Sequence, residues 1–359
     1  MRHSDLPSLY SLLSGKKSSF PLDGQIELTY RCNLDCIHCY CKGSENKANE
    51  LGTADWKRIL DQIHKEGCVY LTISGGDPLV RDDFLELYRY ARAKGFIITV
   101  FTNAQALDKK TIGYLIKSPP YAMEITLNGI TPVTYERISG VKGSFVKAIA
   151  AIKAAKDAGL PVVIKSNCLK QNKHEVTEVK KFADKLLGTG KGKHFFKYDP
   201  LIYPRLNSDK TPCQFRLSYK EILKLKEQDP DIWKEHQKCL NAKPSGPRGT
   251  ASALYWCSSW MQKFFIDPYG WLKFCGFSRN FGVDLKSRAF GEGFYSMITK
   301  LRQAKFTTDS KCRCCSLRPV CYSCPAKAFL ETGNQEAPVD YFCRLAREMS
   351  DEKSELSKV

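Results

Sequence analysis

Apolar and polar residues alternate with two different periods along the first 200 residues of the chain. Strand-like apolar runs occur at residues 25–30, 69–74, 97–101, 122–127, 161–166 and 194–201. Between them, residues 55–65, 82–94, 145–158 and 173–187 carry apolar side chains three and four positions apart, which is typical of amphipathic helices. Six strands alternating with helices predict an α/β fold built on a parallel sheet with right-handed crossovers.

The first strand runs into three closely spaced cysteines, Cys32, Cys36 and Cys39. Thiolates are the soft ligands that iron-sulfur clusters and zinc select, so the spacing alone leaves both metals open. A closed zinc site needs a fourth ligand, which Cys41 or His38 could provide. A 4Fe-4S cluster held by only three cysteines instead keeps one iron free to bind a small molecule.

The second strand ends in Gly75, Gly76, Asp77 and Pro78. Glycines at a strand end let the backbone approach a ligand closely, and proline fixes the exit of the chain. Together with the three cysteines, this segment resembles the radical S-adenosylmethionine (radical SAM) enzymes, in which Glu usually stands at the position of Asp77. The resemblance implies a partial (β/α)6 TIM-like barrel over residues 21–201. It also implies a 4Fe-4S cluster on the three cysteines and S-adenosylmethionine on its open iron, with the Gly-Gly-Asp-Pro segment at the amino group.

Further contacts to S-adenosylmethionine follow from the resemblance alone. It places His38, just before the third cysteine, beside the adenine. The candidates for ribose and carboxylate contacts are strand-end polar residues, namely Asn103, Thr126, Asn128, Arg137 and Ser166. Each of these could instead be an ordinary polar residue of a surface loop.

A second group of cysteines lies near the other end of the chain. It comprises Cys257, Cys275, Cys312, Cys315, Cys321, Cys324 and Cys343, with Gly270 ahead of Cys275. The pattern resembles the SPASM extension of radical SAM enzymes, although relatives usually place three residues between the cysteines that match Cys321 and Cys324.

The resemblance implies a small cysteine-rich SPASM domain over residues 257–345 with two auxiliary 4Fe-4S clusters. Cys312, Cys315, Cys321 and Cys343 would hold the outer cluster. Cys257, Cys275 and Cys324 would hold the inner one, completed by Cys239, by Cys213 or by an open position. Zinc bound to the paired cysteines at 312–324 is the alternative.

The remaining segments are expected to be an N-terminal extension at residues 1–20, a bridging linker or substrate-facing loop at 202–256 and a C-terminal tail at 346–359. The chain has 359 residues, 43% of them hydrophobic, and a formal net charge of +18. It carries neither a secretory signal nor an apolar run long enough to span a membrane, so we expect a cytoplasmic protein with reduced thiols. The basic charge could attract an acidic peptide, or a reductant such as a flavodoxin or ferredoxin. Nucleic acid is a disfavoured partner because no recognised nucleic-acid module is present.

The resemblance predicts reductive cleavage of S-adenosylmethionine to a 5′-deoxyadenosyl radical, which removes hydrogen from a substrate. Auxiliary clusters favour net oxidation. The predicted substrate is a ribosomally made precursor peptide, and the predicted change is a cross-link, a thioether or excision of a backbone fragment. Only 31 residues precede Cys32, too few for a leader-binding domain. We therefore expect a separate leader-binding partner protein. No catalytic base is identifiable.

Three alternatives remain open. The chain could oxidise a small molecule or a tetrapyrrole. It could oxidise Cys or Ser of a sulfatase, which is less expected because Gly276 stands where sulfatase-maturing enzymes carry Asp. It could also be a multi-cluster electron carrier, which would not cleave S-adenosylmethionine.

Overall fold

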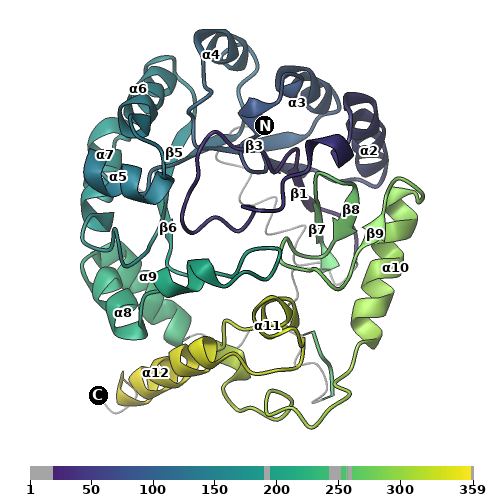
Figure 1. The fold of residues 1–359 in the computed structure, drawn as a ribbon, viewed down its shortest axis with the longest axis vertical. Helices are drawn as coiled ribbons and strands as arrows, with labels where there is room; N and C mark the ends of the chain where they lie inside the picture. Colours follow the sequence, from purple (N-terminus) through teal and green to yellow (C-terminus); the bar gives the residue numbers. More distant parts are fainter. Residues whose placement is uncertain (1–18, 190–194, 242–251, 256, 258–260, 357–359) are drawn as a thin grey trace.

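The fold is organised around one curved sheet of nine strands (Figure 1). The structure is a computed structural model that describes residues 19–189, 195–241, 252–255, 257 and 261–356. The strand order is β6-β5-β4-β3-β2-β1-β7-β8-β9. The first six strands are β1 (Asp23–Glu27), β2 (Tyr70–Ser74), β3 (Ile97–Thr102), β4 (Ala122–Thr126), β5 (Val162–Asn167) and β6 (Phe196–Asp199). Neighbours among them pair in parallel, which confirms the predicted α/β class and all six predicted strands.

Helices cover the outer side of this sheet (Figure 1). They are α2 (Thr53–Lys65), α3 (Phe84–Ala93), α4 (Lys109–Leu115), α5 (Pro132–Ser139), α6 (Ser144–Asp157) and α7 (Val176–Leu187). Side chains of α2, such as Trp56 and Ile59, join a continuous core with the helix-facing residues of the strands, such as Ile73 and Ile164. The helices α4 and α5 were not among the predicted ones, because each is only about two turns long.

Three strands from the second half of the chain extend the sheet beyond β1. These are β7 (Lys263–Ile266), β8 (Trp271–Lys273) and β9 (Val283–Asp284). β7 pairs in parallel with β1, and β8 and β9 follow as antiparallel neighbours. The expectation of a six-stranded sheet is therefore incomplete. Besides β2, the strand β1 has a second neighbour, β7, which lies more than 230 positions later in the sequence.

The region expected to bridge the two halves is largely helical. It contains the short 3-10 helix η3 (Thr211–Phe215), α8 (Tyr219–Glu227) and α9 (Pro230–Asn241). A capping box at Ser218 and Glu221 begins α8. The interpretation of this region as a linker is thus wrong for residues 219–241. The Pro- and Gly-rich segment at 242–249 lies outside the described residues.

The C-terminal part consists of α10 (Phe290–Gln303), η5 (Arg318–Val320), α11 (Pro325–Thr332) and α12 (Asp340–Leu356). Figure 1 shows α11 and α12 below the ring of strands, and α12 packs against α8 and α9. The expected C-terminal tail begins inside α12, which continues to Leu356. Within the described residues, no helix has the length and apolar character needed to cross a membrane.

Candidate active site and cysteine centres

The three N-terminal cysteines lie on a loop that leaves the carboxyl end of β1. Backbone hydrogen bonds tie this loop to the end of α5, from Asp35 N to Ser139 O at 2.8 Å and from Ile37 N to Ile138 O at 3.0 Å. Figure 1 shows the segment that follows β1 lying across the middle of the ring of strands. The carboxyl ends of the strands therefore surround the cysteines, as in other barrels with a site at that face.

The surroundings of these thiols disfavour free thiolates at two of the three positions. Burial raises the pKa of Cys32 to about 12 and raises the pKa of Cys36 above its usual range. A hydrogen bond with Cys41 lowers the pKa of Cys39 to about 7. Because metal ligation requires thiolates, a cationic metal centre would supply the charge that burial withholds. Three converging sulfur donors fit an iron-sulfur cluster.

The Gly-Gly-Asp-Pro segment packs directly against the chain that enters the cysteine loop. Gly76 N donates to Thr29 O at 2.7 Å, and Asp77 N donates to Arg31 O at 3.0 Å. A Cβ on Gly76 would lie 2.4 Å from the carbonyl oxygens of Tyr30 and Arg31, and one on Gly75 would lie 2.2 Å from Thr29 O. The absence of side chains at Gly75 and Gly76 therefore lets this segment pack against the backbone of residues 29–31.

Asp77 joins this segment to the end of β3. Its fully buried carboxylate accepts hydrogen bonds from Leu79 N at 2.9 Å, Thr102 Oγ1 at 2.8 Å and Asn103 N at 2.7 Å. Burial raises the pKa of Asp77 to about 6. Asn103 in turn donates its amide to Cys32 Sγ at 3.3 Å. Asp77 thus helps to position the amide that contacts a predicted cluster ligand.

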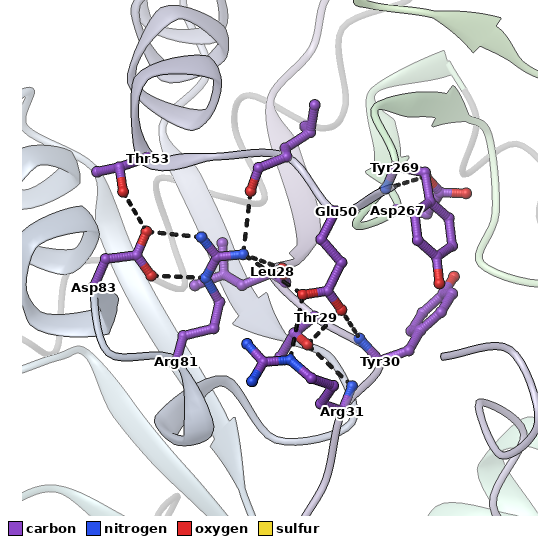
Figure 2. A network of polar contacts seen from close by, with 11 residues as sticks. Leu28, Thr29, Tyr30, Arg31, Glu50, Thr53, Arg81, Asp83, Asp267 and Tyr269 are labelled. Atoms are coloured by element: carbon purple, nitrogen blue, oxygen red, sulfur yellow. Dashed lines mark hydrogen bonds and ion pairs between the residues drawn. The ribbon is translucent and has the colours of Figure 1, made fainter. Parts of the chain in front are cut away.

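A polar network fixes the residues immediately before Cys32 (Figure 2). Glu50 accepts from Thr29 Oγ1 at 2.6 Å and from Tyr30 N at 3.2 Å. Arg81, which follows η2 (Pro78–Val80), donates to the carbonyl oxygens of Leu28 at 3.0 Å and Leu51 at 3.2 Å.

The second half of the network is an ion pair. Arg81 Nε and Nη2 bind the two carboxylate oxygens of Asp83 at 2.8 and 2.7 Å, and Thr53 also donates to this carboxylate at 2.6 Å. The sequence offered no signal for Glu50 or Arg81, because charged residues in loops are usually solvated. Their role follows from the chain path, which buries both.

His38 provides an incompletely satisfied polar group beside the loop. Its Nε2 lies 2.8 Å from the side-chain amide nitrogen of Asn167, at the end of β5. Its Nδ1 is buried and has no hydrogen-bond partner among the described residues. Burial lowers the pKa of His38 to about 4, so the imidazole is neutral at neutral pH. A buried nitrogen without a partner fits the predicted contact with the adenine of S-adenosylmethionine.

The other predicted cofactor contacts differ in their placement. Asn128 Oδ1 accepts from Asn167 N at 2.8 Å and so supports the partner of His38. Thr126 is half-buried and pairs in register with Lys165. Ser166 is fully buried, but it lies on the same face of β5 as Val162 and Ile164, which belong to the core beneath the helices. Arg137 is exposed on α5. Hydrogen bonds therefore link Asn103 to Cys32, and Asn128 through Asn167 to His38.

The predicted outer cysteine set lines one cavity. Cys312, Cys315, Cys321 and Cys343 surround a space of about 90 Å³, and Cys324 reaches the same wall. Electrostatic repulsion among these thiolates contributes to the raised pKa of Cys312, Cys321 and Cys343, after burial, which is the largest cause. Four sulfur donors around one cavity are the ligand type that iron-sulfur clusters select.

The predicted inner set also converges. Burial raises the pKa of Cys275 to about 11, and the charges of Cys324 and Cys257 act in the same direction. Cys213 lies on η3 beside Arg216, which forms a two-point ion pair with Glu331. The side chain of Cys239 lies outside the described residues. All 15 cysteines in the described part of the chain are free thiols. In that part, no three His, Cys, Asp or Glu side chains meet closely enough to ligate one metal ion.

Comparisons with known proteins agree with this arrangement. Residues 26–183 match the radical SAM superfamily. The chain is 25% identical over 331 residues to an AdoMet-dependent heme synthase of Methanosarcina barkeri, a match that covers 86% of this chain and 92% of the synthase. It is 29% identical over 167 residues to a PqqA peptide cyclase of Rhizobium meliloti, covering 46% of this chain and 44% of the cyclase. The chain thus aligns with less than half of the cyclase's length.

A solved structure shows the same fold over most of the chain. SuiB of Streptococcus suis, bound to its precursor peptide SuiA, superimposes with a TM-score of 0.71 and 20% sequence identity, covering 91% of this chain and 76% of that one. The fold and the cysteine loop define a radical SAM barrel with a cysteine-rich C-terminal region consistent with a SPASM domain. Residues 26–183 thus form a radical SAM domain, and members of that superfamily use S-adenosylmethionine and a 4Fe-4S cluster.

Proposed function

We propose that this chain is an oxidative radical SAM enzyme whose substrate is a peptide. When bound, S-adenosylmethionine and the cluster on Cys32, Cys36 and Cys39 supply a 5′-deoxyadenosyl radical that takes a hydrogen atom from the substrate. The observation that supports an oxidative reaction is the pair of cysteine sets that lie close together in the C-terminal region. Such sets fit auxiliary clusters, which can take up an electron from the substrate.

The chain's own residues would prepare the site. Asp77 and Asn103 hold Cys32, the Glu50 and Arg81 network fixes the approach to the loop, and His38 offers a neutral buried nitrogen. A preorganised site keeps a reactive intermediate away from water and in one orientation. The peptide class is supported by the fold shared with SuiB, solved with a precursor peptide, and by the PqqA peptide cyclase among the relatives.

Sulfatase-type oxidation finds less support. A Cβ at Gly276 would lie 2.9 Å from the ring of Phe265, so a side chain at this position would have to displace that ring. Because residue 276 is glycine, the carboxylate expected of such enzymes is missing directly after Cys275. A separate leader-binding partner, a flavodoxin or ferredoxin reductant and the cytoplasm as the site of action are parts of the same proposal.

Tetrapyrrole or small-molecule oxidation is the second candidate. It is favoured by one observation, the alignment with the heme synthase over 92% of that protein's length. The two candidates predict different substrates for the same radical chemistry.

The test uses anaerobically reconstituted, reduced enzyme with S-adenosylmethionine. A candidate precursor peptide, with and without a leader-binding partner, is compared with a metallated porphyrin by mass spectrometry. We expect 5′-deoxyadenosine together with a peptide that has lost hydrogen. Turnover of the porphyrin without any peptide change would favour the second candidate, and an absence of 5′-deoxyadenosine would refute both.

A further inference from the structure

Lys327 lies between the inner cysteine set and the carboxyl end of β6. It is placed one turn after Cys324 on α11, in the part of the structure that Figure 1 shows beneath the sheet. Its Nζ donates to Tyr203 Oη at 2.9 Å and to the carbonyl oxygen of Tyr322 at 3.0 Å. Two acceptors therefore hold the ammonium group in one position.

Aromatic rings surround this lysine. Its Nζ lies 4.5 Å from the ring centroid of Tyr203 and 5.9 Å from that of Phe342. The Tyr203 ring in turn packs against Phe277, with centroids 4.5 Å apart, and Phe277 follows Cys275 by two residues. On its other side Phe277 meets Tyr40, the residue after Cys39, at 5.8 Å. Lys327 thus borders the region between the two groups of cysteines.

The geometry places the charge of Lys327 near the inner cysteines. Lys327 follows Cys324 by three residues at the start of α11, and the Tyr203 ring, whose hydroxyl accepts its hydrogen bond, packs on Phe277, two residues after Cys275. Asp199, at the end of β6, interacts electrostatically with Lys327.

A fixed positive charge beside a thiolate-ligated cluster stabilises the reduced form more than the oxidised form, because reduction adds negative charge. The effect is stronger in a partly buried site, where water screens less. We propose that Lys327 raises the reduction potential of the inner auxiliary cluster on Cys257, Cys275 and Cys324, with Tyr203 as the residue that positions it. This inference rests on the auxiliary clusters of the proposed function. The charge of Lys327 would make the inner cluster a better electron acceptor than the same cluster without that charge.

The experiment compares Lys327→Gln, Lys327→Arg and Tyr203→Phe in the reconstituted full chain. Lys220→Gln on α8 is the control, because Lys220 is exposed and its removal changes the net charge by the same amount. EPR-monitored potentiometry gives the potential of each cluster. Lys327→Gln should lower the potential of one auxiliary cluster and leave that of the Cys32, Cys36 and Cys39 cluster unchanged. Lys327→Arg keeps the positive charge and should therefore have a potential close to that of the wild type. Tyr203→Phe should lower the potential by a smaller amount than Lys327→Gln.

Equal potentials in Lys327→Gln and the wild type would overturn the inference, as would an inner cysteine set without a cluster by iron and sulfide analysis. A shift of the same size in Lys220→Gln would also overturn it, because it would reflect net charge alone. Substrate tests separate this inference from the peptide proposal. If no peptide is modified but the potential still falls in Lys327→Gln, the peptide proposal fails and the role of Lys327 stands.

Discussion

Gly76→Ala tests whether the contact between the two N-terminal motifs depends on the absence of a side chain. The added methyl group would lie 2.4 Å from the carbonyl oxygens of Tyr30 and Arg31. Both neighbours are backbone atoms, and the Glu50 and Arg81 network holds this segment in place. The strain therefore has no flexible side chain to absorb it.

The expected magnitude follows from two contributions. Overpacking in a well-packed region destabilises a protein by about 1 to 3 kcal/mol. Separating the two segments would also weaken the bonds from Gly76 N to Thr29 O, 2.7 Å, and from Asp77 N to Arg31 O, 3.0 Å. Each bond is worth about 1 kcal/mol. We expect a loss of about 2 to 5 kcal/mol, concentrated at the entry to the cysteine loop.

The matched control is Gly113→Ala on α4, where a Cβ meets nothing within 4 Å. Alanine in a helix interior should leave stability unchanged or raise it by up to about 1 kcal/mol. The measurements are thermal denaturation of reconstituted protein, iron content and the EPR signal of the first cluster with and without S-adenosylmethionine. The reasoning is refuted if Gly76→Ala matches the control in both thermal midpoint and EPR signal.

Three further predictions concern other parts of the molecule. Burial raises the pKa of Glu27 from 4.5 to about 8. The folded chain therefore holds this proton more tightly than the unfolded chain, and stability falls as the pH rises between these values, by at most about 1.4 kcal/mol per pH unit. Tyr40 Oη donates a hydrogen bond to Glu27. Glu27→Gln keeps an acceptor for it and should flatten the fall in thermal midpoint between about pH 6 and 8; an unchanged slope would contradict this. Arg81→Lys cannot keep the two-point pair with Asp83 and should lose about 1 to 3 kcal/mol with weaker loading of the first cluster. The same exchange at the half-exposed Arg58 should leave both properties near wild type. Cys312→Ala combined with Cys343→Ala should remove about four irons per chain while the first cluster keeps its EPR signal; a wild-type iron content would show that these cysteines hold no cluster.

The six parallel strands could be predicted because apolar residues recur at every second position along most of them, a local pattern that needs no tertiary information. The strands β7 to β9 were missed. Each is two to four residues long, and pairing with β1 rather than a local pattern makes them strands. The helices α8 and α9 were also missed because their surroundings are rich in lysine and proline, although the capping box at Ser218 was a readable signal.

The opposite orientations of Ser166 and Asn167 show a second limit. Both are polar residues at the end of β5, but neighbouring side chains of a strand point to opposite faces. Only the partners settle which face meets the site, and Asn167 has His38 as its partner whereas Ser166 lies beside the helix-facing core.

The sequence by itself determined the chemistry of this protein. Three thiols with fixed spacing, a glycine pair at a strand end and seven later cysteines restrict the metal centres, since ligand type and local spacing are covalent properties of the chain. The tertiary structure alone decided which groups act on those centres. Arg81, Glu50, Tyr203 and Lys327 carry no local signal. Their roles depend on distances between segments that are far apart in sequence, and packing of the whole chain sets those distances.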